Sequence, residues 1–472
     1  MKSLLSFALF FAVPGVVHAD IFRILDKNND AAQARVDLVQ QAREEILTSY
    51  FIYNNDRAGK YGLALLRQAK RRGVKRIRVI LDANFNELDR GMLKHLKDEG
   101  IEVKLYHPGI FPVTGEKLMK TAYRMADKEY RFGDETLRAV ERMDKRMHDK
   151  LLIVDGHDQG FLLTGGRNMK GDYYGAYEKN YDDRDVLVQS DTAVPDARRY
   201  FLELFESDHV GSTHFARAAT PDEVKLAKLE LDVSMLEMAD PKFNPHFKLD
   251  TCNEVRANEK PVNTVHFIHS EISPDGKDIN TNAVSKELIK LVSNAKGTLL
   301  IETPYLLPTD TFYKVIRKAI DEKGLYVRVL TNSLGSTDGA EVAGAYSTHK
   351  QRLVKMGIDL WEYQGPNYLH AKSGVIDNRI AIIGSYNVDP RSAYLNTEVA
   401  VYVDDRAKGE ELRKSFERNI GGTRSVQIGR NGEPLTPYLH EPSLLDPSDW
   451  IKLLRYHLSR SLADIDVYYE RL

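Results

Sequence analysis

The sequence predicts an α/β protein made of two similar sheet-and-helix domains. Its 472 residues exceed what one hydrophobic core usually supports. Helical and strand patterns alternate along most of the chain, and their order occurs twice. The domain limits that follow are residues 20–215 and 262–425, with 216–261 as a connecting segment and 426–472 as a C-terminal extension.

Residues 1–19 are typical of a secretory signal peptide. One lysine precedes an apolar run from Leu4 to Val13, Pro14-Gly15 ends that run, and small or apolar residues stand before Asp20. An uncleaved anchor is the alternative, but about 14 apolar residues, broken by Pro14-Gly15, are fewer than the roughly 20 that span a bilayer. We therefore expect cleavage after Ala19 and an exported protein, periplasmic or secreted.

The first domain is expected to begin with a helix, a β-prone run, a second helix and a strand. Helical spacing relates the apolar residues Leu38, Val39, Ala42 and Ile46, and the β-prone run is Tyr50 to Tyr53. The second helix ends at Arg72-Gly73 and the strand is Ile77 to Leu81. Gly73 stands where a left-handed residue would end a helix.

The second domain repeats this order. A helix carries Leu288, Leu291, Val292 and Ala295, a strand runs from Leu299 to Glu302, and the next helix ends at Lys323-Gly324. The connecting segment is expected to hold one helix, and the last residues from Asp449 onwards another.

Composition excludes some classes of protein. The net charge of −2 argues against a surface tuned as a whole to a polyanion, although a local basic groove stays open. Cys252 is the only cysteine, so no internal disulfide can form. The histidines form no cluster at metal-ligand spacing, and we expect neither a metal nor another cofactor.

Two sets of residues late in the two halves share their chemistry and spacing. The first is His148, Lys150 and Asp155, and the second is His370, Lys372 and Asp377. Side chains two apart in a strand share a face, so each set projects an imidazole and an ammonium group into one volume. One set alone is most simply a surface histidine and lysine on an edge strand. Two sets at matched places predict a functional site.

Each set is followed by a strand and a turn of small residues. The turns read GGRN, ending at Asn168, and GSYN, containing Ser385 and ending at Asn387. Small residues let an anionic group approach the backbone, and the amides add donors. Gly166 replaces the serine of the second turn. Nine residues separate Asp155 from the first turn, against six in the second half, which predicts an enlarged hairpin turn at 156–160.

These residues resemble the two HKD motifs of the phospholipase D superfamily. The chain is most similar to the bacterial cardiolipin synthases of the short type without a long transmembrane anchor. The stretches that carry the likeness include RMHDK, DRDV, ETPYLLPT, VRVLTNSL, LHAKSGVID and IGSYNVDPRSAYLNTEV. The resemblance implies two phospholipase D-like domains related by a pseudo-twofold axis, with the active site at their interface.

Two imidazoles on opposite sides of a phosphodiester permit covalent catalysis without a metal. The resemblance implies His148 as the nucleophile and His370 as the acid, which then acts as the base for an alcohol or water. Lys150, Lys372, Asn168, Asn387 and Ser385 would hold the non-bridging oxygens.

Each imidazole needs an acceptor on its other nitrogen. The resemblance places this carboxylate at Glu398 after His370. Its counterpart after His148 is expected to be Asp185, with Asp182 and Asp183 as competing candidates.

The same centre serves phospholipases, phosphatidyltransferases and nucleases, so the substrate must be inferred from elsewhere. We expect a monomer that moves a phosphatidyl group from a glycerophospholipid to an alcohol or water, with cardiolipin as one product. A secreted nuclease acting on nucleic acid is the alternative, and intact motifs disfavour an inactive binding module. Ile110, Phe111 and Val113, in the loop 106–115, either dip into a bilayer as a peripheral membrane contact or pack internally.

Overall fold

The computed structural model describes residues 19–107, 145–157, 160–212, 218–240 and 259–463 and contains two eight-stranded mixed sheets. In the first, the order is β1 (Ile21–Leu25), β8 (Asp185–Gln189), β6 (Phe161–Gly165), β5 (Lys150–Val154), β2 (Glu45–Tyr50), β3 (Arg76–Asp82), β4 (Glu102–Tyr106) and β9 (Val210–Gly211). In the second, it is β10 (Val265–His269), β19 (Val399–Asp404), β18 (Ile380–Gly384), β17 (Ser373–Ile376), β13 (Thr298–Glu302), β14 (Tyr326–Asn332), β15 (Asp359–Tyr363) and β20 (Ser425–Gln427).

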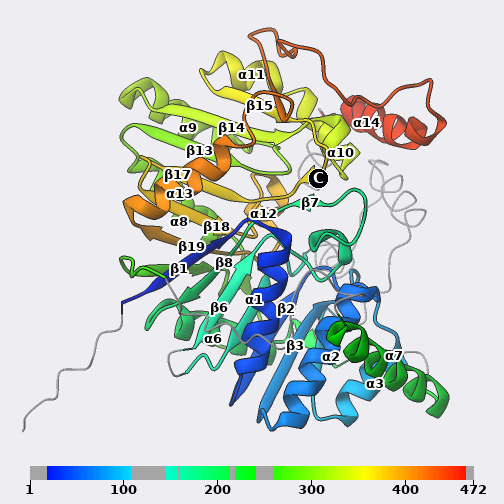
Figure 1. Ribbon diagram of the computed structural model, residues 1–472. Helices are drawn as coiled ribbons and strands as arrows, with labels where there is room; N and C mark the ends of the chain where they lie inside the picture. Colours follow the sequence, from blue (N-terminus) through cyan, green and yellow to red (C-terminus); the bar gives the residue numbers. More distant parts are fainter. Residues whose placement is uncertain (1–18, 108–144, 158–159, 213–217, 241–258, 464–472) are drawn as a thin grey trace, which may run out of the picture.

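The two sheets have the same topology, which confirms the predicted duplication. In each, three neighbouring strands are parallel, β2-β3-β4 and β13-β14-β15, and the other pairings are antiparallel. Figure 1 shows the second half above the first.

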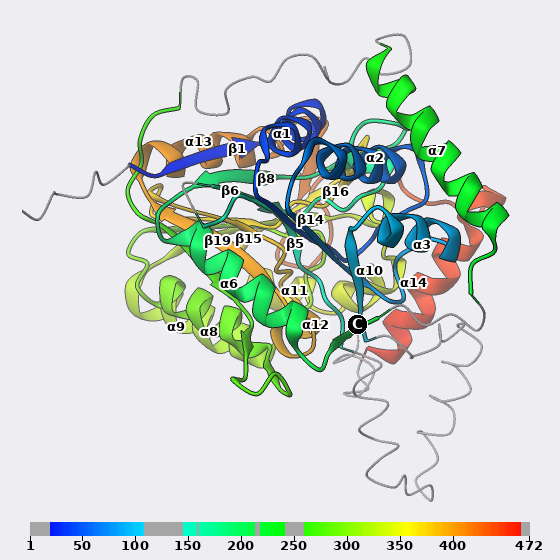
Figure 2. The ribbon, with the colours of Figure 1, turned by 90° about the horizontal axis from the view of Figure 1, so that it is seen from below.

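Helices cover both faces of each sheet. The first half contributes α1 (Asn28–Gln41), α2 (Arg57–Arg72), α3 (Arg90–Asp98) and α6 (Ala193–Glu206), and the second α8 (Asn282–Ser293), α9 (Asp310–Lys323), α10 (Ala340–Ser347), α11 (Lys350–Lys355), α12 (Pro390–Tyr394) and α13 (Arg406–Glu417). Figure 2 shows α1, α2 and α13 on one side of the sheets and α6, α8 and α9 on the other. Since α8 and α9 repeat α1 and α2, this exchange of sides is what a twofold relation between the halves requires.

The halves share part of one hydrophobic core. This core cluster joins Leu47 and Ile153 of the first sheet, Leu300 and Val375 of the second, and apolar side chains of α6 and α13. Burial of this shared surface stabilises the halves against each other.

Most predicted elements lie where the pattern placed them. Helix α2 ends at Arg72 and α9 at Lys323, and Gly73 and Gly324 follow with φ of 110° and 64°. Residues 155–160 join β5 to β6, whereas 377–379 join β17 to β18, so the first turn is the longer one.

The beginning of the first domain is predicted wrongly. Ile46 belongs to strand β2 and not to the first helix, which ends at Gln41, and the strand overlaps the predicted run, Tyr50 to Tyr53, only at Tyr50. Every residue of β2 is buried because both faces of this central strand are covered. Its sequence, EILTSY, places polar residues on both faces and so lacks the strict alternation that marks a half-exposed strand.

Two further helices lie outside the repeated units. The connecting segment forms α7 (Pro221–Ala239), and the C-terminal extension forms α14 (Trp450–Leu462). The predicted signal peptide, the apolar loop after His107 and Cys252 lie outside the described residues. Within the residues described, no helix is both long and apolar enough to cross a bilayer. The domain limits stay predictions.

Candidate active site

Each histidine lies where its half of the chain forms backbone hydrogen bonds with the other half. Strand β7 (Tyr181–Asp182) pairs with β16 (Tyr368–Leu369), and the His370 amide donates to the Asp182 carbonyl at 2.8 Å. In the same way, the His148 amide donates to the Thr397 carbonyl at 3.1 Å. The backbone of each histidine is therefore hydrogen-bonded to the other half of the chain. The accepting residue directly precedes a carboxylate: Asp182 precedes Asp183, and Thr397 precedes Glu398.

These carboxylates hold the imidazole rings. Nδ1 of His370 lies 2.6 Å from Oδ2 of Asp183, and Nδ1 of His148 lies 2.9 Å from Oε1 of Glu398. Both pairs are buried. A carboxylate at Nδ1 places the proton of a neutral imidazole on that nitrogen, so each Nε2 can attack or exchange a proton with a substrate.

Each histidine is thus supported by the opposite half, and Asp185 is not one of the supports. Asp185 forms buried ion pairs with Arg35 at 2.9 Å and Arg167 at 3.4 Å. Sheet register also corrects the prediction, since Asp185 pairs with Gly165 as Ala400 pairs with Gly384. The counterpart of Glu398 lies two residues earlier, at Asp183. Residues two apart in a strand share a face, so alternation alone could not separate the two.

Ser385 holds Glu398 instead of facing a substrate oxygen, which corrects its predicted role. Its hydroxyl donates to Glu398 Oε2, the Ser392 hydroxyl donates to Oε1 at 2.6 Å, and the Ser270 hydroxyl accepts the Glu398 amide at 3.0 Å. These contacts fix the carboxylate that orients His148.

Asp183 explains why the first turn carries glycine where the second has serine. A Cβ at Gly166 would lie 2.1 Å from Oδ1 of Asp183. The carboxylate therefore occupies the space that a side chain at position 166 would need.

Both lysines are buried beside their histidines. Lys150 Nζ donates to the His148 carbonyl at 2.5 Å, and Lys372 Nζ donates to the His370 carbonyl at 2.6 Å and lies 3.0 Å from Nε2 of the His370 ring. Burial lowers the pKa of Lys150 to about 7 and that of Lys372 to about 8. An anionic phosphate would favour the charged form of both, because an opposite charge raises the pKa of an amine.

The two histidine–carboxylate pairs differ in charge. Burial and the nearby lysines Lys150 and Lys372 hold the pKa of His148 well below its usual value, and burial raises the pKa of Glu398 to about 7. Burial also opposes charge on Asp183, but the His370 ring and Lys372 hold its pKa below the usual value. The pKa of His370 is lowered by burial and Lys372, whereas Asp183 acts to raise it. The first pair favours a neutral imidazole, and the second keeps an ionised partner for an imidazolium.

Aromatic side chains close the site. The ring centroids of Phe51 and His148 are 5.0 Å apart, and those of Tyr181 and His370 are 5.1 Å apart. Asp338 accepts from the hydroxyls of Tyr181 at 2.8 Å and Tyr305 at 2.7 Å. Sequence reasoning missed these residues. The likeness covered the segments around Tyr305 and Tyr181, but neither tyrosine nor Asp338 has a counterpart in a repeated motif.

The two asparagines lie next to the site. Asn168 accepts from the Ile52 amide at 3.1 Å and donates to the Tyr173 hydroxyl at 3.1 Å, and that hydroxyl is 3.4 Å from Nε2 of His370. Asn387 has a buried Oδ1 that finds no partner within the described part of the chain.

The aspartates of the two motifs lie at the other end of their strands, which corrects their placement among the catalytic residues. Asp155 accepts from the amides of Glu44 and Glu45, each at 2.8 Å, and Asp377 accepts from the amide of Gly297 at 2.7 Å. Five residues of strand put Asp155 roughly 16 Å from Lys150 along the chain. Both aspartates bind backbone amides at the start of the neighbouring strand, β2 or β13, which runs antiparallel to their own.

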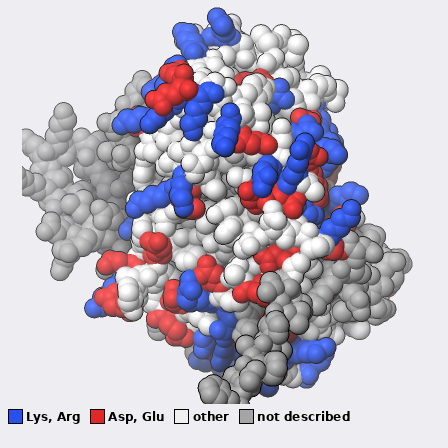
Figure 3. Space-filling view, turned by 90° about the vertical axis from the view of Figure 1, so that its left-hand side faces the viewer, with Lys and Arg blue, Asp and Glu red and all other residues white. Residues whose placement is uncertain are grey.

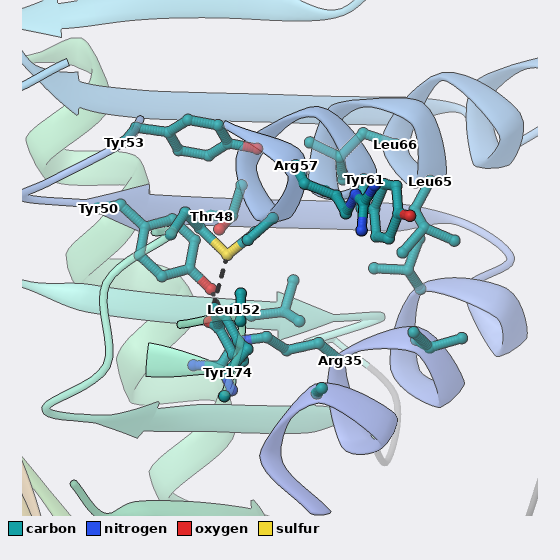
Figure 4. A pocket seen from close by; sticks show the side chains of 18 residues that line it. Arg35, Thr48, Tyr50, Tyr53, Arg57, Tyr61, Leu65, Leu66, Leu152 and Tyr174 are labelled. Carbon is teal, nitrogen blue, oxygen red and sulfur yellow. Dashed lines mark hydrogen bonds between the residues drawn. The ribbon is translucent and has the colours of Figure 1, made fainter. Parts of the chain in front are cut away.

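Two apolar cavities lie under the helices, and neither His148 nor His370 lines them. One, of about 270 Å³, lies between α1, α2 and the first sheet, with Tyr50 and Tyr174 among its walls (Figure 4). The second, of about 370 Å³, lies between α8, α9 and the second sheet and has Lys372 in its wall. Across the described residues, no group of three His, Cys, Asp or Glu side chains is arranged to hold a metal.

Comparison with known proteins places this geometry in a family. The family model described as "Cardiolipin synthase, PLD-like domain" matches residues 36–205 and 288–420. Cardiolipin synthase C of Escherichia coli is 26% identical over 436 residues, which cover 83% of this chain and 83% of that protein. The major cardiolipin synthase ClsA of Bacillus subtilis is 24% identical over 401 residues, 84% of this chain and 68% of that protein.

A solved structure shares the two-domain fold. It is the phosphatidylserine synthase of Haemophilus influenzae Rd KW20, at 14% identity and a TM-score of 0.61, covering 96% of this chain and 95% of that one. An uncharacterized protein of Helicobacter pylori is 29% identical over 457 residues, 92% of this chain and 86% of that protein.

Proposed function

The chain belongs to the family of cardiolipin synthases with phospholipase D-like domains, and from this premise we propose that it forms cardiolipin through a phosphohistidine. It is a phosphatidyltransferase of the phospholipase D superfamily. The observation that carries the proposal is the crossed pair of buried contacts, His148 with Glu398 and His370 with Asp183, which leaves both Nε2 atoms for one phosphodiester.

In the first step, Nε2 of His148 attacks the phosphorus of a phosphatidylglycerol. A nitrogen–phosphorus bond forms, the bond from phosphorus to the headgroup glycerol breaks, and His370 donates its proton to the departing oxygen. The lowered pKa of His148 supports its role, since it must be neutral to attack, and the ionised Asp183 beside His370 favours the proton that His370 must carry.

In the second step, His370 takes the proton of an acceptor hydroxyl. The acceptor oxygen bonds to phosphorus and the bond to His148 breaks, so His370 regains its proton and His148 its free Nε2. With the glycerol hydroxyl of a second phosphatidylglycerol as acceptor the product is cardiolipin, and with water it is phosphatidic acid.

The lysines offset charge during both steps. Lys150 and Lys372 approach the site from opposite halves, and a protonated amine there stabilises the extra negative charge on the phosphoryl oxygens in the transition state. Burial strengthens this attraction because water does not screen it.

We also propose that the enzyme works outside the cytoplasm. The N-terminal pattern of one lysine, a short apolar run and Ala19 supports this location. N-terminal sequencing of the protein recovered from a periplasmic or culture fraction tests it: a chain that begins at Asp20 supports export, and one retained in the cytoplasm from Met1 contradicts it.

One experiment tests the activity. The purified protein is incubated with phosphatidylglycerol vesicles labelled in the phosphate, with His148→Asn and His370→Asn as matched inactive controls, and the lipids are separated. Labelled cardiolipin and released glycerol support the proposal. Phosphatidic acid alone would show that water is the acceptor, and no lipid product together with cleavage of single-stranded DNA would replace the proposal with a nuclease.

A further inference from the structure

We propose that one side of the molecule, formed by α7, α14 and the turn before α14, docks onto the surface of a phospholipid bilayer and so brings the site to its substrate. This docking face comprises eight exposed apolar side chains: Leu226, Leu229, Val233, Leu236, Leu444, Leu445, Trp450 and Ile451, with Leu454 and Leu458 continuing it along α14. The inference rests on the proposed function for its choice of lipid.

Helix α14 exposes its apolar residues instead of burying them. Ile451 is 72% exposed and Leu454 68%, and Trp450 and Leu458 lie on the same outward side. The opposite side of the helix packs closely on α10, since a Cβ at Gly344 would lie 2.3 Å from the Tyr456 carbonyl. The helix is therefore held in place while its apolar surface faces solvent.

The turn before α14 extends this surface. Leu444 is 73% exposed and Leu445 94%. Single exposed leucines are common on protein surfaces. A contiguous patch of large apolar side chains, in contrast, marks a surface that contacts an apolar partner.

Helix α7 presents a second apolar row. Leu226, Leu229, Val233 and Leu236 recur at helical spacing and are all exposed. Its opposite side, with Leu231 buried, packs on α2 and α3. A row of large apolar side chains left exposed on the outer side of a packed helix indicates a surface that meets an apolar partner.

The two helices lie on the same side of the molecule. In Figures 1 and 2 both stand along the right-hand edge, although their positions along that edge differ. Figure 3 looks at the opposite side, where charged side chains of both signs are scattered over the surface. Because both helices lie on one side of the molecule, both apolar rows can contact one flat partner.

Short chains of contacts connect both helices to His370. Lys452 of α14 interacts electrostatically with Asp338, which accepts from Tyr181 and Tyr305 beside His370. On the other side, Glu230 of α7 accepts from Lys60 of α2 at 2.9 Å. The N-cap residue of that helix, Asp56, accepts from the Gly171 amide at 2.7 Å, two residues before Tyr173.

A bilayer fits this face better than a second protein copy. The site needs a diacyl lipid whose headgroup lies at a membrane surface, and both helices are connected by short chains of contacts to residues beside His370. Trp450 is the residue type that favours the boundary between headgroups and acyl chains, and the exposed Arg460 of α14 would attract anionic headgroups.

Vesicle flotation tests the docking face. The full-length protein is mixed with vesicles of phosphatidylethanolamine and phosphatidylglycerol, and a variant with Ile451→Glu and Leu454→Glu is compared with the unchanged protein. The matched control adds two negative charges at exposed helix positions away from the docking face, with Thr311→Glu in α9 and Ala407→Glu in α13. We expect at least about tenfold weaker vesicle binding for the α14 variant and unchanged binding for the control.

A second measurement separates docking from the proposed function. On short-chain phosphatidylglycerol dissolved as monomers, the α14 variant should turn over as fast as the unchanged protein, which also shows that it is folded. If the protein binds vesicles through this face but forms no lipid product, the docking face stands and the proposed function fails.

Equal vesicle binding by the α14 variant and the unchanged protein overturns the docking face. So does a dimer, measured by light scattering, that these two substitutions dissociate while vesicle binding persists. The latter outcome would assign the face to a second copy of the chain.

Discussion

The crossed support of the histidines predicts that Asp183, and not Asp185, controls turnover. In Asp183→Asn, Nδ1 of His370 keeps a neighbour at 2.6 Å of similar shape but loses the negative charge that stabilises an imidazolium. A buried hydrogen bond to a charged group contributes roughly 1.5–3 kcal/mol. At about 1.4 kcal/mol per tenfold change in rate, kcat should fall roughly 10- to 150-fold.

Asp185→Asn is the matched control, two residues away on the same strand side. Asp185 touches neither histidine and pairs with Arg35 and Arg167. Removing its charge leaves buried guanidinium groups without their partner, which costs roughly 3–5 kcal/mol of stability. We expect a lower Tm and a kcat per folded molecule close to that of the unchanged protein.

The assay measures product formation from short-chain phosphatidylglycerol under saturating conditions, with the folded fraction taken from circular dichroism at the same temperature. The reasoning is refuted if Asp185→Asn is the slow variant while Asp183→Asn keeps full kcat. A fall confined to KM in Asp183→Asn would also contradict it, because it would show that Asp183 assists binding and not proton transfer.

Three further predictions concern charge and packing. Because burial lowers the pKa of Lys150 to about 7 and of Lys372 to about 8, kcat/KM should fall as the pH rises through these values and the amines lose their charge. Lys150→Arg should move the onset of that fall from about pH 7 toward the pKa of Lys372 at about 8, and a pH–rate profile unchanged by it would count against a role for Lys150. Gly166→Ser should lower kcat at least about tenfold, since its Cβ meets Oδ1 of Asp183 at 2.1 Å, and full activity would show that the carboxylate is dispensable. Arg184→Gln leaves the buried Glu302 of the second half and the half-buried Asp26 of the first without their partner and should cost roughly 3–5 kcal/mol in thermal unfolding, so an unchanged Tm would contradict this account.

The duplicated architecture could be predicted because each half repeats local signals. Gly73 and Gly324 end equivalent helices, and both do so in the left-handed conformation. The start of the first domain could not be placed, because Ile46 lies four residues after Ala42 and continues the helical spacing by chance. Burial on both faces of β2, a property of the assembled sheet, decides its structure.

In the site, too, some residues could be predicted from local spacing and others could not. His148, Lys150, His370 and Lys372 follow from spacing within one strand, where side chains two apart share a face. Their supports come from the other half: the observed partner of His148, Glu398, is 250 residues away, whereas the expected partner Asp185 is 37 residues away in the same half. No local pattern shows which half supplies a carboxylate.

Some roles predicted from the resemblance differ from the contacts found. Asp155 and Asp377 belong to the motifs by spacing, yet they bind backbone amides at the far ends of their strands. Ser385 supports Glu398, and Asn168 is bonded to Ile52 and Tyr173. A motif therefore contains residues that build the strands as well as residues that face the substrate.

Mapping the covalent intermediate tests the central claim most directly. A phosphatidyl ester whose leaving group departs without a proton is mixed with His370→Asn, the reaction is stopped under alkaline conditions that preserve phosphohistidine, and the adduct is located by mass spectrometry. The account predicts one phosphatidyl group on His148, and none in the matched His148→Asn protein. An adduct at position 370 in the unchanged protein, or none on either histidine, would contradict it.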